Sequence, residues 1–236
     1  MHRNAVIVPS RGRPQNVARL IGAWIETATW DTDLVVAVDE NDPELPRYFE
    51  VCPPWADLKV GPPSRIGPIL NRLGPELAEH YEVVGFMGDD HLPRTPAWDQ
   101  ILARPLQQSS ATGYVGVAYA NDLHQSERLP TMCMVSSPII RGLGYMCPPT
   151  LVHLFLDDFW KQLGTDLGRL SYYSSVIIEH MHPVAGKAQF DPGYSFSLSP
   201  ELMEGDRARY QKFLAEDWPG DLEKLQAYLR GVPAGD

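Results

Sequence analysis

Three short polar segments hold the side chains best suited to chemistry, and each of them follows a short apolar run. Apolar runs of this length that end abruptly at polar residues are typical of buried parallel strands. In a parallel sheet, ligands bind at the carboxyl ends of the strands, so we expect the three segments to converge on one site. The polar segments are residues 10–13, 39–42 and 89–91, which follow apolar residues 5–8, 34–38 and 83–87.

The strongest candidates are the adjacent carboxylates Asp89 and Asp90. Two carboxylates at a strand end are hard oxygen ligands of the kind that hold Mg²⁺ or Mn²⁺ against a diphosphate. A solvated turn would contain the same residues. The predicted convergence of two further polar segments on this edge favours the metal site.

Other residues of these segments could hold a nucleotide. Asp39 could hydrogen-bond a ribose or a base, although acidic turns also follow strands where no ligand binds. Arg11, Arg13 and Arg65 could neutralise phosphates, or could simply be solvated, and Arg11 is the preferred candidate of the three.

Two later segments offer a general base and nitrogen ligands. Asp157 and Asp158 lie in the first turn of a helix predicted over residues 155–163. There a carboxylate could deprotonate an acceptor hydroxyl or serve only the helix dipole. His180 and His182 follow a strand predicted over residues 176–178 and share one face of an extended chain. Either imidazole could join the metal, a prediction that depends on the rest of the assembly.

Helices are predicted between the strands that position these residues. Strand, helix, strand, helix, strand is the alternation of an α/β fold with a central, mostly parallel sheet flanked by helices. A further strand is predicted over residues 114–118, and Ser199 and Pro200 begin a helical tail with another helix over residues 221–230. The apolar helix faces are Val17, Leu20, Ile21, Trp24 and Ile25, then Ile66, Ile69, Leu70, Leu73 and Leu77.

The composition is that of a globular protein. The chain has 236 residues, 44% of them hydrophobic, and no apolar run approaches the roughly 18 residues of a membrane span. The N-terminus does not resemble a signal peptide, so we expect a cytoplasmic protein. The net charge of −10 disfavours extensive contact with nucleic-acid backbone without excluding a small footprint. Cys52, Cys133 and Cys147 show no metal or disulfide pattern and are predicted to be buried thiols.

Several common enzyme motifs are absent from the sequence. It contains no G-x-x-x-x-G-K-[ST] loop, no G-x-S-x-G elbow and no G-x-G-x-x-G fingerprint. These absences set aside the corresponding P-loop, hydrolase and dinucleotide-binding chemistries.

The order of the motifs resembles the GT-A-fold (Rossmann-like) nucleotide-sugar glycosyltransferases. The resemblance spans about the first hundred residues and continues more weakly to about Asp191. It implies that Pro9, Arg11 and Asp39 hold the nucleoside of the donor, and Ser10 is predicted to belong to the same donor-binding site. The segments that carry it are Val6 to Pro14, Val36 to Asp39, Asn71 and Phe86 to Pro93.

The resemblance also implies roles in metal binding and catalysis. The D-x-D motif would fall on Gly88-Asp89-Asp90, with Asp90 as the metal ligand and Asp89 as a substitute, although Gly88 replaces the first Asp. Residues 156–160 look like the segment that supplies the base in inverting members, which would make Asp158 the base. The segment from residue 179 resembles small phage-encoded members, in which a late histidine completes the metal site. If the histidine–metal arrangement instead resembles that of retaining members, the predicted stereochemistry reverses, so inversion is preferred only slightly.

The sequence therefore predicts a metal-dependent glycosyltransferase of α/β, GT-A fold that moves a sugar from a nucleotide-sugar, with a UDP-sugar preferred, to a hydroxyl. The acceptor would be a hydroxymethylated base of phage DNA or a Ser or Thr of a virion protein. Residues 1–198 would form one domain, with a donor-binding half (1–100) and an acceptor half (101–198), and residues 199–236 would pack on it as helices. The alternatives are a nucleotidyltransferase and a nucleotide- or sugar-binding protein without turnover.

Overall fold

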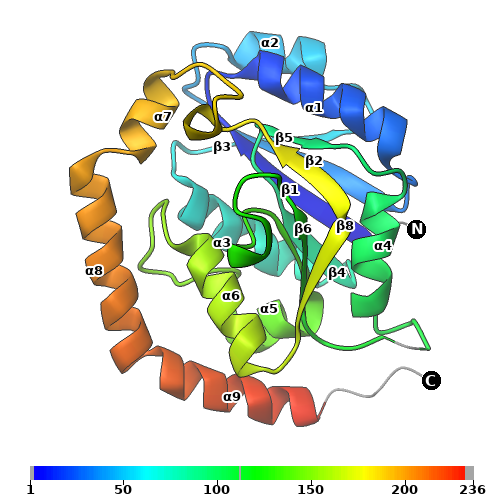
Figure 1. Ribbon diagram of the computed structural model, residues 1–236, viewed down its shortest axis with the longest axis vertical. Coiled ribbons are helices and arrows are strands. Elements are labelled where there is room, and N and C mark those ends of the chain that lie inside the picture. The colour runs from blue at the N-terminus through cyan, green and yellow to red at the C-terminus, as the bar shows by residue number, and fades with distance from the viewer. Residues whose placement is uncertain (1–2, 112, 232–236) are drawn as a thin grey trace.

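The computed structural model describes residues 3–111 and 113–231, in which a single curled sheet of eight strands lies between two layers of helices (Figure 1). The strand order is β3-β2-β1-β4-β7-β6-β8-β5. The strands are β1 (Asn4–Ser10), β2 (Thr32–Asp39), β3 (Asp57–Gly61), β4 (Val83–Phe86), β5 (His91–Pro93), β6 (Val117–Asn121), β7 (Cys133–Ser136) and β8 (Leu170–His180).

The first half of the sheet is parallel, as the sequence predicts. β1 lies between β2 and β4, β3 lies outside β2, and these pairings are all parallel. β1 and β2 therefore end on the same edge, at Ser10 and Asp39, and β4 ends beside them ahead of the turn that carries Asp89 and Asp90. The second half is mixed: β7 is antiparallel to β4 and β6, β8 is parallel to β6, and β5 is antiparallel to β8.

Both faces of the sheet are buried under helices. Ala5 and Ile7 of β1 face one apolar cluster, and Val6 and Val8 face the other, which explains why residues 5–8 are all apolar. The face of Val6 and Val8 carries α1 (Pro14–Thr27), α2 (Leu45–Val51) and α4 (Trp98–Ala103). The other face carries α3 (Ile66–Ala78), α5 (Ser137–Leu143) and α6 (Leu156–Asp166), with α8 (Pro200–Glu216) and α9 (Trp218–Arg230) wrapped around its outside (Figure 1).

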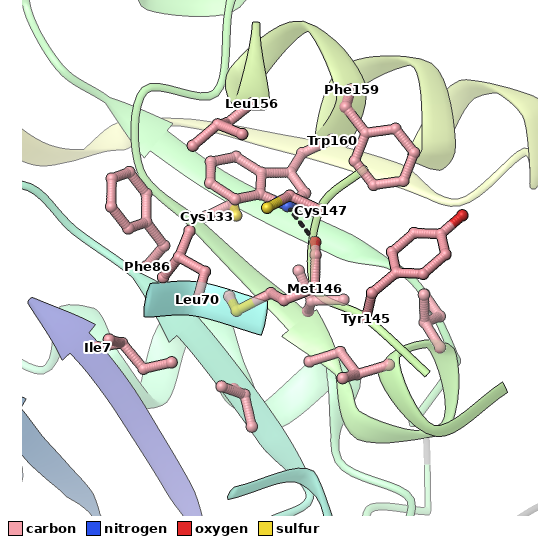
Figure 2. Packing of buried hydrophobic residues seen from close by; sticks show 14 of the residues in the cluster. Ile7, Leu70, Phe86, Cys133, Tyr145, Met146, Cys147, Leu156, Phe159 and Trp160 are labelled. Atoms are coloured by element: carbon pink, nitrogen blue, oxygen red, sulfur yellow. Dashed lines mark hydrogen bonds between the residues drawn. The ribbon is translucent and has the colours of Figure 1, made fainter. Parts of the chain in front are cut away.

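Trp160 is the centre of the second face and fixes the position of α6. The indole is fully buried, its ring centroid lies 5.1 Å from that of Phe86, and its Nε1 donates a hydrogen bond of 2.9 Å to the carbonyl of Met146 (Figure 2). Because the polar atom of the indole is satisfied, the large ring is buried without a desolvation penalty. One turn before Trp160, the helix carries the predicted catalytic carboxylates.

The structure confirms the α/β fold with its central sheet and helical tail, and corrects several details. Ile25 lies at the margin of the α1 stripe and is 52% exposed. Cys133 and Cys147 are buried, but Cys52 is only half-buried. Ser199 occupies the N-cap of α8, yet its side chain makes no capping hydrogen bond.

Several elements were not predicted from the sequence. β8 begins at Leu170, six residues before the predicted strand, because its first half is only half-buried and lacks an apolar pattern. The other unpredicted elements are α2, α4, α5, α7 (Pro192–Ser197), β3, β5 and β7. Within the part of the chain that the structure describes, no helix is both long and apolar enough to cross a membrane.

Candidate functional site

A cavity of about 740 Å³ opens at the carboxyl ends of β1, β2 and β4. It is closed on its far side by α7 and the segment before it, and by the start of α6. Two of the predicted site residues, Asn71 and Asp158, do not line it. The predicted residues that do are Pro9, Ser10, Arg11, Arg13, Asp39, Arg65, Asp89, Asp90, Asp157, His180 and His182.

Asp39 lies in one corner of the cavity as half of an ion pair. Nη1 of Arg11 bonds Asp39 and also lies 2.8 Å from Oδ1 of Asn41. The backbone N–H of Ser64 donates to the other oxygen of Asp39 at 3.0 Å. A nucleoside entering this corner would therefore meet a fixed Arg11–Asp39 pair rather than a free carboxylate.

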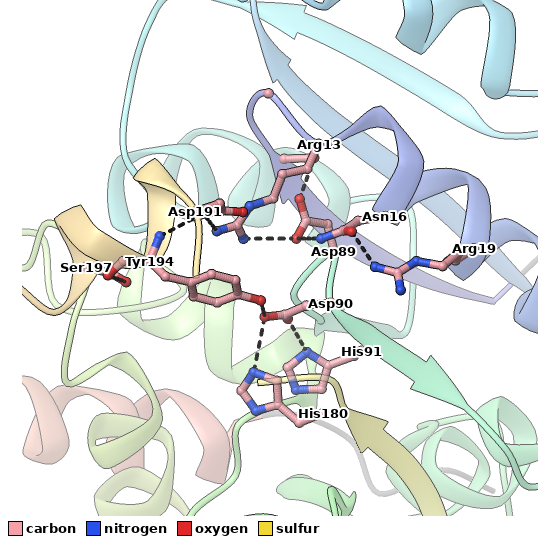
Figure 3. Close-up of polar contacts among 12 residues, drawn as sticks. Arg13, Asn16, Arg19, Asp89, Asp90, His91, His180, Asp191, Tyr194 and Ser197 are labelled. Atoms are coloured by element: carbon pink, nitrogen blue, oxygen red, sulfur yellow. Dashed lines mark hydrogen bonds and ion pairs between the residues drawn. The ribbon is translucent and has the colours of Figure 1, made fainter. Parts of the chain in front are cut away.

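Asp89 is a buried anchor between β1, α1 and the turn after β4. Its carboxylate accepts a hydrogen bond of 2.6 Å from Oγ of Ser10 and one of 3.4 Å from Nδ2 of Asn16, and lies 3.5 Å from Nη1 of Arg13 (Figure 3). Burial and the neighbouring charge of Asp90 raise the pKa of Asp89. Arg13 also bonds Asp191 at 2.6 Å, so the structure groups Asp89 with this arginine and not with the histidines.

Asp90 turns the other way, toward two imidazoles. One carboxylate oxygen lies 3.2 Å from Nδ1 of His91 and the other lies 3.3 Å from Nε2 of His180 (Figure 3). His91 and His180 are directly opposite each other in the β5–β8 pair, and their rings stack with centroids 4.0 Å apart. The hydroxyl of Tyr194 donates to Asp90 at 2.6 Å.

This group fits a divalent cation. One ligand atom each from Asp90, His91 and His180 lies within 4.8 Å of the other two. A carboxylate oxygen is a ligand suited to Mn²⁺ and Mg²⁺, and imidazole nitrogens are suited to first-row transition-metal ions, so this donor set can take a divalent transition metal. Burial would raise the pKa of Asp90, but hydrogen bonds from His180 and His91 lower it well below its ordinary value. Burial opposes the charge on His180, yet the carboxylates of Asp122 and Asp90 raise its pKa to about 9.

Sequence reasoning did not select His91, although it adjoins the predicted ligand Asp90. His91 could have been predicted as a metal ligand, because its imidazole directly follows the acidic pair Asp89-Asp90 in the sequence. His182 lines the cavity but lies outside the metal group, with its ring centroid 5.0 Å from that of His180. Burial and the charge of His180 lower the pKa of His182 to about 4. Of the two histidines left open by the sequence, the structure brings His180 to Asp90.

The carboxylate that faces the cavity from α6 is Asp157. Burial, and then the charge of Asp158, raise the pKa of Asp157 to about 7. Asp158 does not line the cavity, and burial raises its pKa as well. Successive helix residues point about 100° apart, and here the direction that takes Asp157 into the cavity takes Asp158 away from it. Of the two predicted catalytic carboxylates, Asp157 is therefore the one that lines the cavity, whereas the sequence resemblance favoured Asp158 as the base.

Two other predicted donor-binding residues have partners within the protein. The guanidinium of Arg65 stacks over the ring of Phe196 at 3.6 Å, and both residues line the cavity. Asn71 accepts hydrogen bonds of 2.9 and 3.0 Å from the N–H groups of Met146 and Cys147 and donates to the carbonyl of Cys147. Asn71 therefore fastens the loop that supports Trp160, outside the cavity.

Asp206 of α8 holds the loop that leads into α6. This fully buried carboxylate accepts hydrogen bonds of 2.8 Å from the N–H groups of His153 and Leu154 and one of 3.4 Å from that of Val152. Arg209 balances its charge at 2.8 Å. The C-terminal helices thus set one wall of the cavity, since His153 and Leu154 line it.

Replacing Asp206 with Ala should destabilise the protein by about 3 kcal/mol, because it leaves buried N–H groups of this loop without an acceptor. The melting temperature, measured by calorimetry, should fall by roughly 6–12 °C at about 2–4 °C per kcal/mol. Glu204→Ala, at an exposed position of the same helix, is the control and should leave it unchanged. Equal melting temperatures for the two variants would show that Asp206 does not hold the loop.

No protein-family model matches the sequence, and no curated protein is similar to it in sequence. Solved structures are similar in fold. S. aureus TarS 1–349 in complex with UDP-GlcNAc has a TM-score of 0.55 at 14% identity, over 98% of this chain and 82% of that one. The mannosyltransferase PcManGT of Pyrobaculum calidifontis, in complex with GDP-Man and Mn²⁺, has a TM-score of 0.54 at 15% identity, over 97% and 74% of the two chains.

A third similar structure is glucosyl-3-phosphoglycerate synthase of Mycobacterium tuberculosis in complex with Mn²⁺, UDP and phosphoglyceric acid. Its TM-score is 0.55 at 13% identity, over 88% of this chain and 78% of that one. All three solved structures are of nucleotide-sugar glycosyltransferases. With a mixed sheet between two helical layers, this chain has the GT-A fold of those enzymes.

Proposed function

We propose that this protein is a metal-dependent glycosyltransferase that moves a sugar from a nucleotide-sugar to an acceptor hydroxyl. The observation that carries the proposal is that one cavity brings together the metal group, the Arg11–Asp39 pair and the carboxylate of Asp157. The reaction needs a cation for the leaving diphosphate, a binding site for the nucleoside and a base for the acceptor hydroxyl, and these three features would supply them in that order. The GT-A fold supports the same reaction class, since the structural neighbours bind UDP, UDP-GlcNAc or GDP-Man.

Asp90, His91 and His180 would hold the cation, which would neutralise the charge that develops on the leaving diphosphate. The Arg11–Asp39 corner would bind the nucleoside, and we propose a UDP-sugar as the preferred donor with Mn²⁺ or Mg²⁺ as the cation. Pro9 and Ser10 end β1 beside this corner and would shape its floor.

Asp157 would take the proton of the acceptor hydroxyl. A pKa of about 7 suits a general base, because about half of the group is ionised at neutral pH and the carboxylate still binds a proton well. The deprotonated oxygen would attack the anomeric carbon as the bond to the diphosphate breaks. Direct displacement of this kind inverts the anomeric centre, which is the stereochemistry we propose.

For the acceptor we propose a hydroxyl of a phage-type substrate, either a hydroxymethylated DNA base or a Ser or Thr of a virion protein, in the host cytoplasm. The net charge of −10 favours an acceptor that makes little contact with DNA backbone. Assays with hydroxymethylated oligonucleotides and with virion proteins, each with the labelled donor, would separate the two.

The first test is a donor screen by thermal shift, with UDP-, GDP-, CMP- and dTDP-sugars in the presence and absence of Mn²⁺. A ligand at 100 times its Kd adds about 2.7 kcal/mol of stability, or roughly 5–10 °C in a domain of this size. We expect such a shift with one donor, and only when Mn²⁺ is present. No shift with any donor would refute the proposed donor site, and a shift without transfer to any acceptor would favour a binding protein.

A further inference from the structure

Thr131 lies between the metal group and the buried carboxylate of Asp122. Its hydroxyl oxygen is 2.8 Å from Oδ2 of Asp122 and 3.3 Å from Nε2 of His91. A carboxylate can only accept, so the single hydroxyl proton of Thr131 is donated to Asp122. The oxygen of Thr131 must then accept a hydrogen bond from His91, which places a proton on Nε2 of that ring.

The proton on Nε2 decides what His91 presents to the cavity. A neutral imidazole with its proton on Nε2 has its lone pair on Nδ1. That nitrogen lies 3.2 Å from a carboxylate oxygen of Asp90, which also carries only lone pairs. Without a cation, a proton on Nδ1 can join these two atoms, and a cation that replaces this proton meets a lone pair from each of them. The contact with Thr131 therefore prepares His91 to ligate a cation together with Asp90.

Asp122 influences which nitrogen of His180 carries a proton, as Thr131 does for His91. Oδ2 of Asp122 lies 3.7 Å from Nδ1 of His180, while Nε2 of that ring lies 3.3 Å from Asp90. At this distance the carboxylate makes no hydrogen bond but still favours a proton on Nδ1 by its charge, so Nε2, which faces Asp90, is the nitrogen that would give up its proton to a cation. The backbone N–H of His180 also donates to the carbonyl of Asp122 at 2.9 Å, which fixes the two residues relative to each other.

The carboxylate of Asp122 is itself held rigidly. Its Oδ1 accepts hydrogen bonds of 2.9, 2.7 and 2.8 Å from the N–H groups of His124, Gln125 and Ser126. Burial opposes the charge of this carboxyl, but the three hydrogen bonds keep it ionised and hold it in place. They also mean that replacing Asp122 would disrupt this turn, whereas the hydroxyl of Thr131 can be removed without touching these bonds.

We propose that Thr131 and Asp122 are positioning residues that hold His91 and His180 in the tautomers that bind a divalent cation. This inference rests on the proposed metal-dependent function, because it assigns supporting contacts to the same site. Neither residue ligates the cation. Groups that orient a ligand histidine through its other nitrogen typically change metal affinity by about 10–100-fold when they are removed.

The test compares Mn²⁺ binding by wild-type protein, Thr131→Val, Thr131→Ser and Asp90→Ala, using titration calorimetry without nucleotide. Thr131→Val keeps the shape of the side chain and removes only the hydroxyl, and we expect its Kd to rise by about 10–100-fold. Thr131→Ser retains the hydroxyl and should bind almost as tightly as the wild type. Melting temperatures verify folding, and Thr131→Ala replaces the Val variant if Val is not accommodated.

A second readout reports the tautomer directly. Long-range ¹H–¹⁵N NMR spectra of the metal-free protein should show His91 protonated on Nε2 in the wild type and as a mixture in the Val variant. A wild-type ring protonated on Nδ1 alone would overturn the inference, and so would equal Kd values for the wild type and Thr131→Val.

The metal site and the positioning role of Thr131 can be tested separately. If Asp90→Ala abolishes Mn²⁺ binding while Thr131→Val does not weaken it, the metal site stands and only the positioning role is lost. If Asp90→Ala binds Mn²⁺ as tightly as the wild type, the metal site itself is wrong, and the positioning role falls with it.

Discussion

Replacing Asp157 with Asn should lower kcat for sugar transfer by roughly 10²–10⁴-fold, the usual contribution of a positioned general base. Asn has nearly the same shape but cannot take a proton, so the KM for the donor should stay close to its wild-type value. The reason is that Asp157 lines the cavity at the start of α6, apart from the Arg11–Asp39 corner proposed for the nucleoside. The measurement is steady-state kinetics with the donor that the thermal screen identifies.

Asp158→Asn is the matched control, because it makes the same chemical change at the adjacent position, which does not line the cavity. Its kcat should remain near that of the wild type. A larger loss in Asp158→Asn than in Asp157→Asn would restore the assignment that the sequence resemblance favoured.

The pH dependence of kcat should identify the same residue. Since the base must be ionised and burial raises the pKa of Asp157 to about 7, kcat should rise as pH increases through about 7 and level off above it. The charge of Asp158 contributes to that raised pKa, so Asp158→Asn should move the rising limb to lower pH. If the rising limb of kcat against pH lies at the same pH in Asp158→Asn and in the wild type, a group other than Asp157 titrates.

Replacing Asp90 with Ala should remove metal-dependent donor binding and lower turnover by at least about 10³-fold, roughly 4 kcal/mol. Asp90 supplies the only carboxylate of the metal group that the described residues form, and its two oxygens face His91 and His180. Thermal shift with donor and Mn²⁺ measures the binding, and Asp90→Asn repeats the experiment with a side chain of similar size.

Glu50→Ala, an exposed carboxylate of α2 outside the cavity, is the control and should keep the full metal-dependent shift. Removing the metal from the wild type with a chelator should reproduce the loss seen in Asp90→Ala and should not change that variant further. A metal-dependent shift that persists in both Asp90 variants would place the cation elsewhere.

The first half of the fold could be predicted because local pattern and tertiary environment agree there. β1, β2 and β4 are buried on both faces, so they appear as continuous apolar runs, and helices α1 and α3 between them carry apolar stripes. The convergence of Ser10, Asp39 and Asp90 then followed from the parallel order of the strands. Edge strand β3 and short strand β5 lack such patterns and were missed.

The supporting contacts of the site could not be predicted, because they join residues far apart in the sequence. His91 meets His180 only through the antiparallel pairing of β5 with β8. Asp191 and Tyr194 reach Arg13 and Asp90 only because α7 folds back over the cavity. Neither contact leaves a periodic signal in the sequence, which records local burial and not partners.

By itself the sequence determined the residue types of the site, the strand ends that carry them and the α/β class, since each depends on local apolar pattern. Only the tertiary structure decided which neighbours or cavity each member of a pair of nearby residues faces. Asp90 rather than Asp89 faces the imidazoles, Asp157 rather than Asp158 lines the cavity, and His180 rather than His182 joins the metal group. Neighbouring side chains point in different directions, and the packing of each element against the rest of the protein sets which direction leads into the cavity.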